Sequence, residues 1–309
     1  MKLISVVTPC FNEEENVEAL YKRVKDIFSG LKDYQYEHIF IDNSSSDKTV
    51  EILKNLGRTD KNVKIIVNSR NFGHIRSPFY GMIQGRGDAV IWLVADFQDP
   101  PEMILDFLKK WEEGYKIVVG IKKKSKESSI MFMIRNFYYT LISRLSEIEL
   151  IQNFTGFGLY DKRIIEILRT IDDPYPYFRG LVAEVGFDVA KIEFVQPARR
   201  KGRTKNNFYT LFDMAMLGIT NHSKVPLRFA TMLGFASSLF CILIGLGYLI
   251  YKLIFWNSFT VGLAPLVIGF FFFASVQLFF IGLLGEYIGS IHTHVLKRPL
   301  VIEKERINF

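Results

Sequence analysis

The segment DAVIWLVADFQDPPE, residues 88–102, joins an apolar run to a cluster of carboxylates, an amide and two prolines. Its apolar part, residues 88–95, has the length and composition of a strand that is buried on both faces, as in a parallel sheet. The polar part begins at Asp96, where such a strand would leave the sheet. Ligands of parallel α/β sheets bind beyond the carboxyl ends of the strands, so this segment predicts both a fold class and the place of a site.

The same pattern recurs through the first half of the chain. Four further apolar runs are predicted to be strands: ISVVT (4–8), HIFID (38–42), VKIIV (63–67) and YKIVVG (115–120). Apolar residues at helical spacing predict helices after the strands, at 17–31, 47–56, 76–86, 101–113 and 130–146. Alternating strands and helices predict a doubly wound α/β domain.

The composition changes after residue 226. No charged residue occurs between Arg228 and Lys252, or between Lys252 and Glu286, and each stretch exceeds the roughly 20 residues that cross a bilayer. A buried hairpin in a soluble core is the alternative, but it would need a much larger protein around it. The sequence therefore predicts two transmembrane helices joined by a short turn, with Trp256 at the membrane interface.

Charge sets the expected orientation. Lys224 and Arg228 precede the hairpin and Lys297 and Arg298 follow it, whereas Lys252 alone lies at the turn. The positive-inside rule then places the N-terminal domain and the C-terminal tail in the cytoplasm. The net charge of +7 favours anionic partners, and two cysteines suit a reducing compartment. Because the basic clusters flank membrane spans, we expect a membrane partner and no nucleic acid.

Three predicted strand ends carry the candidate site residues. After residues 4–8, Glu14 and Glu15 are explained by a helix N-terminus, but Pro9 and Asn12 are not. Asp42 ends its strand without a local role, which favours ligand binding over a structural hydrogen bond.

In the opening segment, Asp99 with Pro100 and Glu102 fits the N-cap of the next helix. If the strand stays extended, Asp96 and Gln98 project to the same side, and their oxygens would suit a hard divalent cation. A single carboxylate is a weak metal site unless a diphosphate supplies further oxygens.

The motifs PCFNEEEN, IDNSSSDKT, RNFG, GDAVIWLVADFQDPPE and RRKGRTK, followed by two apolar spans, resemble the family 2 glycosyltransferases that act on polyprenyl phosphates. Dolichol-phosphate mannose synthases and bactoprenol glucosyltransferases are the most similar types. The resemblance implies a GT-A nucleotide-sugar-binding domain with a C-terminal two-helix transmembrane hairpin. It divides the chain into a cytoplasmic catalytic domain (1–205), an interfacial segment (206–226), two transmembrane helices (227–290) and a cytoplasmic tail (291–309).

The resemblance also assigns roles. It implies nucleotide binding by Pro9, Phe11, Asn12, Glu13, Asp42 and Gly202, and Mg²⁺ or Mn²⁺ binding by Asp96 and Gln98. Arg199 and Lys205 match a loop that closes over the diphosphate, and with Asp96 they form the expected catalytic set. Lys122 and Arg135 match positions that contact the acceptor phosphate. The sequence departs from the family at Val94, where an aspartate is usual, and at Asn43 and Ser44, which replace an Asp-Gly pair.

The cluster Arg199–Lys205 has a second interpretation as a basic loop that faces anionic lipid. The expected reaction is inverting transfer of a hexose, glucose from UDP-glucose by resemblance, to polyprenyl phosphate. A processive polysaccharide synthase and a non-catalytic membrane scaffold remain the alternatives. Gly285 and Gly289 form a small-residue face that predicts a homo-oligomer through the transmembrane helices, with Glu286 between them.

Overall fold

The computed structural model describes residues 1–123, 151–197, 216, 225–255 and 263–309. Some of the sequence predictions lie outside these residues. They are the helix at 130–146, most of the interfacial segment, Trp256, and four candidate site residues: Arg135, Arg199, Gly202 and Lys205.

The α/β domain is built on one mixed eight-stranded sheet of order β7-β5-β6-β4-β1-β2-β3-β8. Strands β1, β2, β3 and β4 run parallel, β6 is antiparallel to both of its neighbours, and β8 is antiparallel to β3. The strands are β1 (Lys2–Cys10), β2 (Tyr34–Asp42), β3 (Val63–Asn68), β4 (Ala89–Trp92), β5 (Ile117–Lys122), β6 (Phe154–Asp161), β7 (Val189–Phe194) and β8 (Glu303–Ile307).

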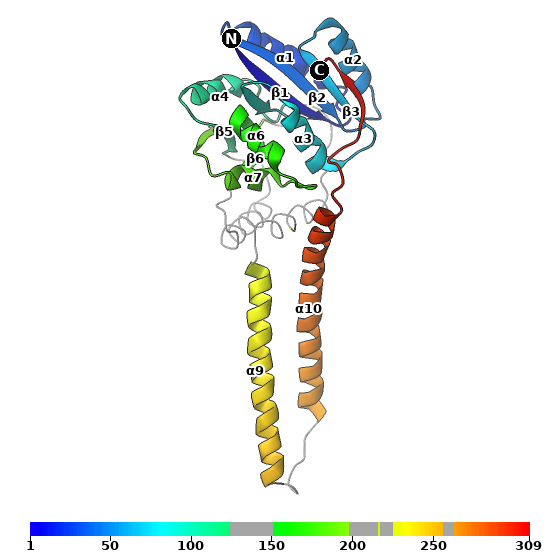
Figure 1. Cartoon of the computed structure of the whole chain (residues 1–309), viewed down its shortest axis with the longest axis vertical. Helices are drawn as coiled ribbons and strands as arrows, with labels where there is room; N and C mark the ends of the chain where they lie inside the picture. The colour runs from blue at the N-terminus through cyan, green and yellow to red at the C-terminus, as the bar shows by residue number, and fades with distance from the viewer. Residues whose placement is uncertain (124–150, 198–215, 217–224, 256–262) are drawn as a thin grey trace.

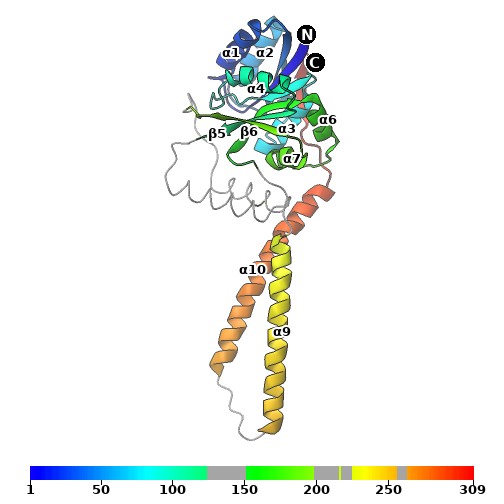
Figure 2. The same ribbon diagram turned by 90° about the vertical axis from the view of Figure 1, so that its left-hand side faces the viewer.

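Helices cover both faces of this sheet (Figures 1 and 2). One apolar cluster joins the sheet to α1 (Val17–Ser29), α2 (Thr49–Thr59) and α4 (Met103–Glu112). A second cluster joins it to α3 (Gly73–Gln84), α6 (Lys162–Thr170) and α7 (Phe178–Glu184). The predicted α/β class is confirmed, as are the five predicted strands. Strand β4 is shorter than predicted, because it ends at Trp92 and not at residue 95.

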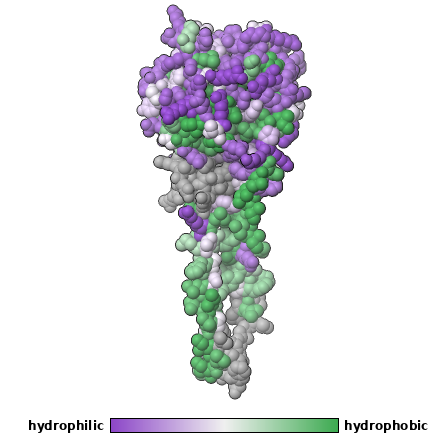
Figure 3. Space-filling model, in the orientation of Figure 1, coloured by the Kyte–Doolittle hydropathy of each residue, from purple (hydrophilic) through white to green (hydrophobic). Residues whose placement is uncertain are grey.

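Two long helices, α9 (Val225–Ile254) and α10 (Leu263–Val295), project together from one side of the domain (Figures 1 and 2). Both are long and apolar enough to cross a membrane, and none of their most apolar windows is buried. Their described side chains form an apolar surface that continues away from the hydrophilic domain (Figure 3). A hairpin buried in a soluble core would have the opposite burial, so that alternative does not fit.

The C-terminal tail is where the structure differs most from the expected division. Residues 291–309 were expected to form a separate tail, but α10 continues to Val295 and β8 completes the edge of the sheet. Tyr80 in α3 donates to Glu303 at 2.8 Å, and Lys54 in α2 pairs with Glu305 at 2.5 Å. The tail therefore fastens the membrane hairpin to the edge of the catalytic sheet.

Asn308 closes this attachment. Its side-chain amide donates to the backbone carbonyls of Gly57 at 2.7 Å and Val63 at 2.9 Å. A Cβ at position 57 would lie 3.2 Å from the Asn308 amide nitrogen, so glycine permits this approach. Asn308 itself has a φ of 63°, a left-handed conformation that asparagine tolerates better than most residues.

We predict that Asn308→Ala lowers the unfolding free energy by about 2–3 kcal/mol, because two carbonyls lose their donor and alanine disfavours the left-handed conformation. Lys54→Ala, which removes the partly exposed ion pair with Glu305, is expected to cost less than about 1 kcal/mol. Thermal unfolding of the detergent-solubilised protein measures both. Equal losses for the two variants would contradict a specific role for Asn308.

Candidate active site

The loops that follow β1 and β2 are joined by hydrogen bonds at the carboxyl edge of the sheet. The Asn12 amide donates to Ser45 Oγ at 2.8 Å, and the Asn12 side-chain oxygen accepts from the Ser46 amide at 2.8 Å. The Glu13 amide donates to Thr49 Oγ1 at 2.8 Å. Asn12 has a φ of 56°, which turns the chain back across the neighbouring loop. The structure thus brings together the sequence motifs that begin at Pro9 and Asp42.

Asp42 lies at the centre of these two loops, paired in register with Cys10. It is fully buried, and Ser45 donates to it through both its amide (2.9 Å) and its hydroxyl (2.5 Å). Burial raises the pKa of Asp42, and the Ser45 hydrogen bonds oppose that shift. Asp42 therefore makes structural hydrogen bonds with Ser45. These bonds do not exclude ligand binding, which the sequence favoured.

The pKa of Cys10 reflects the negative charge around the loops that follow β1 and β2. Burial raises the pKa of its thiol well above the usual value, and the negative charges of Asp42, Glu13 and Asp47 add to the shift. The thiol is therefore protonated at neutral pH. The concentration of acidic side chains around it favours groups that donate hydrogen bonds, such as a nucleobase edge or ribose hydroxyls.

Asn43, directly after β2, forms hydrogen bonds with the segment that follows β3. Its side-chain oxygen accepts from the Phe72 amide at 2.9 Å, and its amide donates to Asn71 Oδ1 at 2.9 Å and Gly73 O at 3.0 Å. These bonds position the RNFG motif at the start of α3. Asn43 was noted in the sequence only as a departure from the family pattern, so this role was missed.

The segment after β4 does not remain extended. Phe97 has a φ of 60°, and the Gln98 amide donates to Asp96 Oδ1 at 3.0 Å. The prediction that Asp96 and Gln98 lie on one side of an extended strand is therefore wrong in its premise. The chain instead turns tightly between them, with Asp96 buried and Gln98 partly exposed. Strand β4 is parallel to β1, so Asp96 leaves the sheet beside the loop that carries Pro9 to Glu13.

Asp99 does not cap the next helix. Helix α4 begins at Met103 with Glu102 at the N-cap position, and no side-chain cap hydrogen bond is made there. Asp99 is instead 3% exposed and accepts a hydrogen bond from the Val94 amide. It closes the turn that carries Asp96. The sequence-based assignment was wrong because the two prolines form a separate turn before the helix starts.

Asp96 and Asp99 are close enough to interact electrostatically. Burial and the charge of Asp96 together raise the pKa of Asp99 to about 7, although the Val94 amide and Lys122 at the end of β5 have the opposite effect. Lys122, expected to contact the acceptor phosphate, thus lies near these carboxylates. Val94 carries no charge, so Asp99 provides the second carboxylate of this segment from a different position.

Aromatic side chains form a wall at the end of β4 that the sequence did not reveal. Trp92, the last residue of β4, stacks on Phe178, the first residue of α7, with ring centroids 5.2 Å apart. Gly156 lies beside both rings, and its φ of 106° is a conformation that residues with a side chain rarely adopt. The contact joins residues 86 positions apart, so only the tertiary structure could show it.

His38, which lies in β2 near these groups, is not a poised base. His38 is fully buried, bonds to Thr8 Oγ1 at 2.9 Å and stacks on Phe40. Burial lowers the pKa of His38 to about 3, so the ring is neutral and belongs to the core.

The sheet order, the convergence of three strand ends and the two apolar helices define an α/β domain with a candidate site at its carboxyl edge and a helical extension suited to a membrane. The pattern of Glycosyl transferase family 2 matches residues 5–168, and the GtrB C-terminal hairpin matches residues 225–291. The chain therefore belongs to glycosyltransferase family 2 and carries the GtrB-type hairpin, which confirms the resemblance drawn from the sequence.

Its relatives match over nearly the whole chain. The uncharacterized glycosyltransferase YkcC of Bacillus subtilis is 34% identical over 304 residues, covering 96% of this chain and 92% of that protein. The SfII prophage-derived bactoprenol glucosyl transferase of Shigella flexneri is 33% identical over 303 residues, covering 98% and 97%.

A solved structure supports the fold. Glucosyl-3-phosphoglycerate synthase from Mycobacterium tuberculosis, crystallised with Mn²⁺, uridine-diphosphate and phosphoglyceric acid, aligns with a TM-score of 0.50 at 18% identity. The alignment covers 71% of this chain and 76% of that one. The GT-A-like mixed α/β sheet is therefore confirmed.

The raised pKa of Asp99 predicts a pH-dependent stability. An acid whose pKa is higher in the folded state loses stability as pH rises from its unfolded value near 4 to about 7. Because Asn carries no charge, we predict that the stability of Asp99→Asn relative to the wild type improves by on the order of 2–3 kcal/mol between about pH 5 and about pH 8. Unfolding is followed in EDTA, because a bound cation would favour the charged carboxylate.

Asp106→Asn, which removes an exposed carboxylate from α4, controls for the loss of one negative charge. A relative stability of Asp99→Asn that is unchanged across this pH range would mean that Asp99 is already ionised in the folded protein at the lower pH.

Proposed function

We propose that this glycosyltransferase moves a hexose, glucose from UDP-glucose, onto a polyprenyl phosphate with inversion at the anomeric carbon. The observation that carries the proposal is the 33% identity to a bactoprenol glucosyl transferase across both the catalytic domain and the hairpin. A lipid acceptor would explain the two apolar helices, because they would hold the enzyme at the membrane that contains its substrate.

The donor nucleotide would bind at the joined loops after β1 and β2. Pro9, Phe11, Asn12 and Glu13 enter this edge from β1, and Asp42 enters it from β2. Buried Asp42 is oriented by Ser45, and a carboxylate that accepts two such bonds retains further acceptor sites for a hydroxyl or an imino group.

The donor set after β4 fits a divalent cation of the Mg²⁺ or Mn²⁺ type. Two carboxylates, Asp96 and Asp99, lie close enough that one raises the pKa of the other, and a cation relieves such repulsion. Asp96 and Gln98 would hold the ion with the diphosphate oxygens of the donor, since the described residues contain no cluster of three His, Cys, Asp or Glu side chains. When bound, the ion would neutralise charge on the leaving nucleoside diphosphate.

The acceptor needs little activation. A phosphate monoester has a second pKa near 6, so it is mostly a dianion at neutral pH and can attack the anomeric carbon directly. The buried, neutral His38 is then not needed as a base. Lys122, near Asp99, would position the acceptor phosphate, and Arg135, Arg199 and Lys205 would supply further positive charge. Gly202 would let the basic loop approach the nucleotide.

Membranes that contain the enzyme test this function with labelled UDP-glucose and undecaprenyl phosphate. A solvent-extractable product that mild acid releases as glucose supports the proposal, and parallel reactions with UDP-GlcNAc and GDP-mannose test the donor. A long polymer would instead indicate a processive synthase. No product with any donor would indicate a non-catalytic scaffold.

We predict that Asp96→Ala lowers the transfer rate about a thousandfold or more, because it removes the main charge that faces the cation and diphosphate. Val94→Asp is expected to lower the concentration of Mn²⁺ or Mg²⁺ that gives half-maximal rate. Initial rates against metal concentration measure both effects. The exposed Asp106→Asn is the control. A near-normal transfer rate in Asp96→Ala would contradict the assignment of Asp96 to the active site.

The orientation across the membrane gives a second prediction. A cysteine at exposed Lys22 in α1 should react with a membrane-impermeant maleimide only after cells are permeabilised, because we place the catalytic domain in the cytoplasm. A cysteine at residue 257, between the spans, should react in intact cells. Native Cys10 is buried, and a Cys241→Ser background removes the other thiol. The reverse labelling pattern would contradict the proposed topology.

A further inference from the structure

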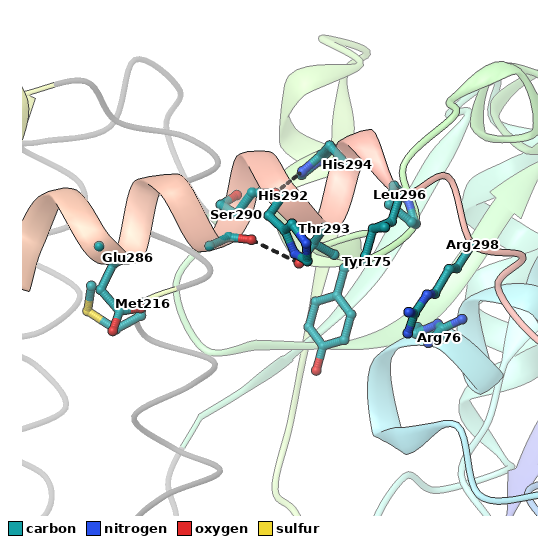
Figure 4. Close-up of a pocket in the computed structure, with 13 residues that line it drawn as sticks. Arg76, Tyr175, Met216, Glu286, Ser290, His292, Thr293, His294, Leu296 and Arg298 are labelled. Atoms are coloured by element: carbon teal, nitrogen blue, oxygen red, sulfur yellow. Dashed lines mark hydrogen bonds between the residues drawn. The ribbon is translucent and has the colours of Figure 1, made fainter.

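A cavity of about 700 Å³ lies between the end of α10 and the domain (Figure 4), and its described lining includes neither Asp96 nor Lys122. Its walls come from residues 285–298 of α10 and the tail, the 174–175 loop, and Arg76 in the first turn of α3. This volume is in the range of about 300–1,000 Å³ that is usual for small-molecule sites, and it far exceeds what one ion needs.

Two arginines meet at the end of this cavity that lies nearest the domain. Arg76 and Arg298 lie side by side in Figure 4, and the charge of Arg298 contributes to lowering the pKa of Arg76, after burial and the charge of Arg70. Within the described part of the chain, neither arginine forms an ion pair with a carboxylate. Two guanidinium groups without an acidic partner attract an anion.

The hydrogen-bond donors of Arg76 are also not all satisfied by the protein. One terminal nitrogen donates to the carbonyl of Pro299, but its Nε is buried and has no hydrogen-bond partner. A buried donor without an acceptor costs free energy, which a bound oxygen would recover. The acidic side chain that lines the cavity among the described residues, Glu286, lies at the opposite end in Figure 4.

The position of the cavity indicates the kind of anion. The candidate span Gly269–Val295 ends within the cavity wall, so the arginines lie where apolar helix gives way to the hydrophilic domain. Ile288 and Ile291, on the same stretch of α10 but outside the cavity wall, are 63% and 61% exposed, as on a helix surrounded by lipid. Lipid phosphates are found at this level of a membrane, and their hydrocarbon chains would lie against such side chains.

We propose that this cavity binds the phosphate group of a membrane lipid between Arg76 and Arg298, with the hydrocarbon chain along α10. The described lining shares no residue with the set assigned to transfer, and the proposal does not depend on the reaction proposed above. Gly285 and Gly289 form part of its wall and have no atom within 4 Å of a built Cβ, so the glycine face leaves room for the chain. The expected oligomer through these glycines stays a prediction.

Full-length protein in uncharged detergent tests the site by equilibrium binding. The probes are short-chain phosphatidylglycerol, undecaprenyl phosphate, and dioctanoylglycerol, which has no phosphate. The wild type is expected to bind at least one phosphate lipid and not dioctanoylglycerol. Arg298→Ala and Arg76→Gln should each weaken that binding about tenfold or more, since each removes charged hydrogen bonds.

Lys297→Ala is the matched control. Lys297 is adjacent to Arg298 and carries the same charge, but it faces Asp172 at 3.5 Å and lines a different cavity. It should change the affinity less than about twofold. The phosphate lipid whose affinity falls more in Arg298→Ala identifies the source of the phosphate, either phospholipid or polyprenyl phosphate.

Equal weakening by Lys297→Ala and Arg298→Ala would show non-specific attraction to a basic surface and overturn the proposal, as would equal binding of dioctanoylglycerol. Arg298→Ala is the primary variant, because it leaves the hydrogen bond from Arg76 to Pro299 in place. Unchanged melting of each variant shows that a loss of affinity is not a loss of fold.

Discussion

The parallel pairing of β1 with β2 on one side and β4 on the other is the constraint on which the site depends. Because parallel strands end at the same edge, this pairing delivers three polar loops to one place. Asn12 joins the loops after β1 and β2, Ser45 holds Asp42 within the second of these loops, and Asn43 ties that loop to the segment after β3. Preorganised polar groups of this kind need little rearrangement on binding.

Buried carboxylates lie at this edge of the sheet, and their negative charge is stabilised differently after β2 and after β4. At β2 the balance is made by hydrogen bonds, because Ser45 donates twice to Asp42. At β4 it is incomplete, because Asp96 and Asp99 share one turn and Lys122 compensates only in part. A pair of carboxylates that is only partly compensated has the charge that a divalent cation would neutralise.

The chain returns from the membrane to the sheet that it left. After α10, residues Glu303–Ile307 pair with β3, and Asn308 bonds to two carbonyls near the end of α2 and the start of β3. The hairpin is thus held to the domain by the tail, while the arginine-lined cavity lies at the junction. An enzyme whose acceptor is embedded in a bilayer gains from such an attachment, because it limits how far the site can move from the membrane surface.

The sequence by itself determined the α/β class, the two apolar spans and the strand ends that carry Pro9, Asp42 and Asp96. These follow from local periodicity and composition, which depend on neighbours along the chain. It misassigned Asp99 as a helix cap, because a cap and a turn-closing carboxylate have the same local pattern of Asp followed by proline. Strand β8 was missed because EKERI alternates charges, as an exposed edge strand does. Only the tertiary structure decided the partners of Asn43, the stacking of Trp92 on Phe178 and the meeting of Arg76 with Arg298. Each of these contacts joins residues distant in sequence, and no local pattern records which distant segment the sheet order brings alongside.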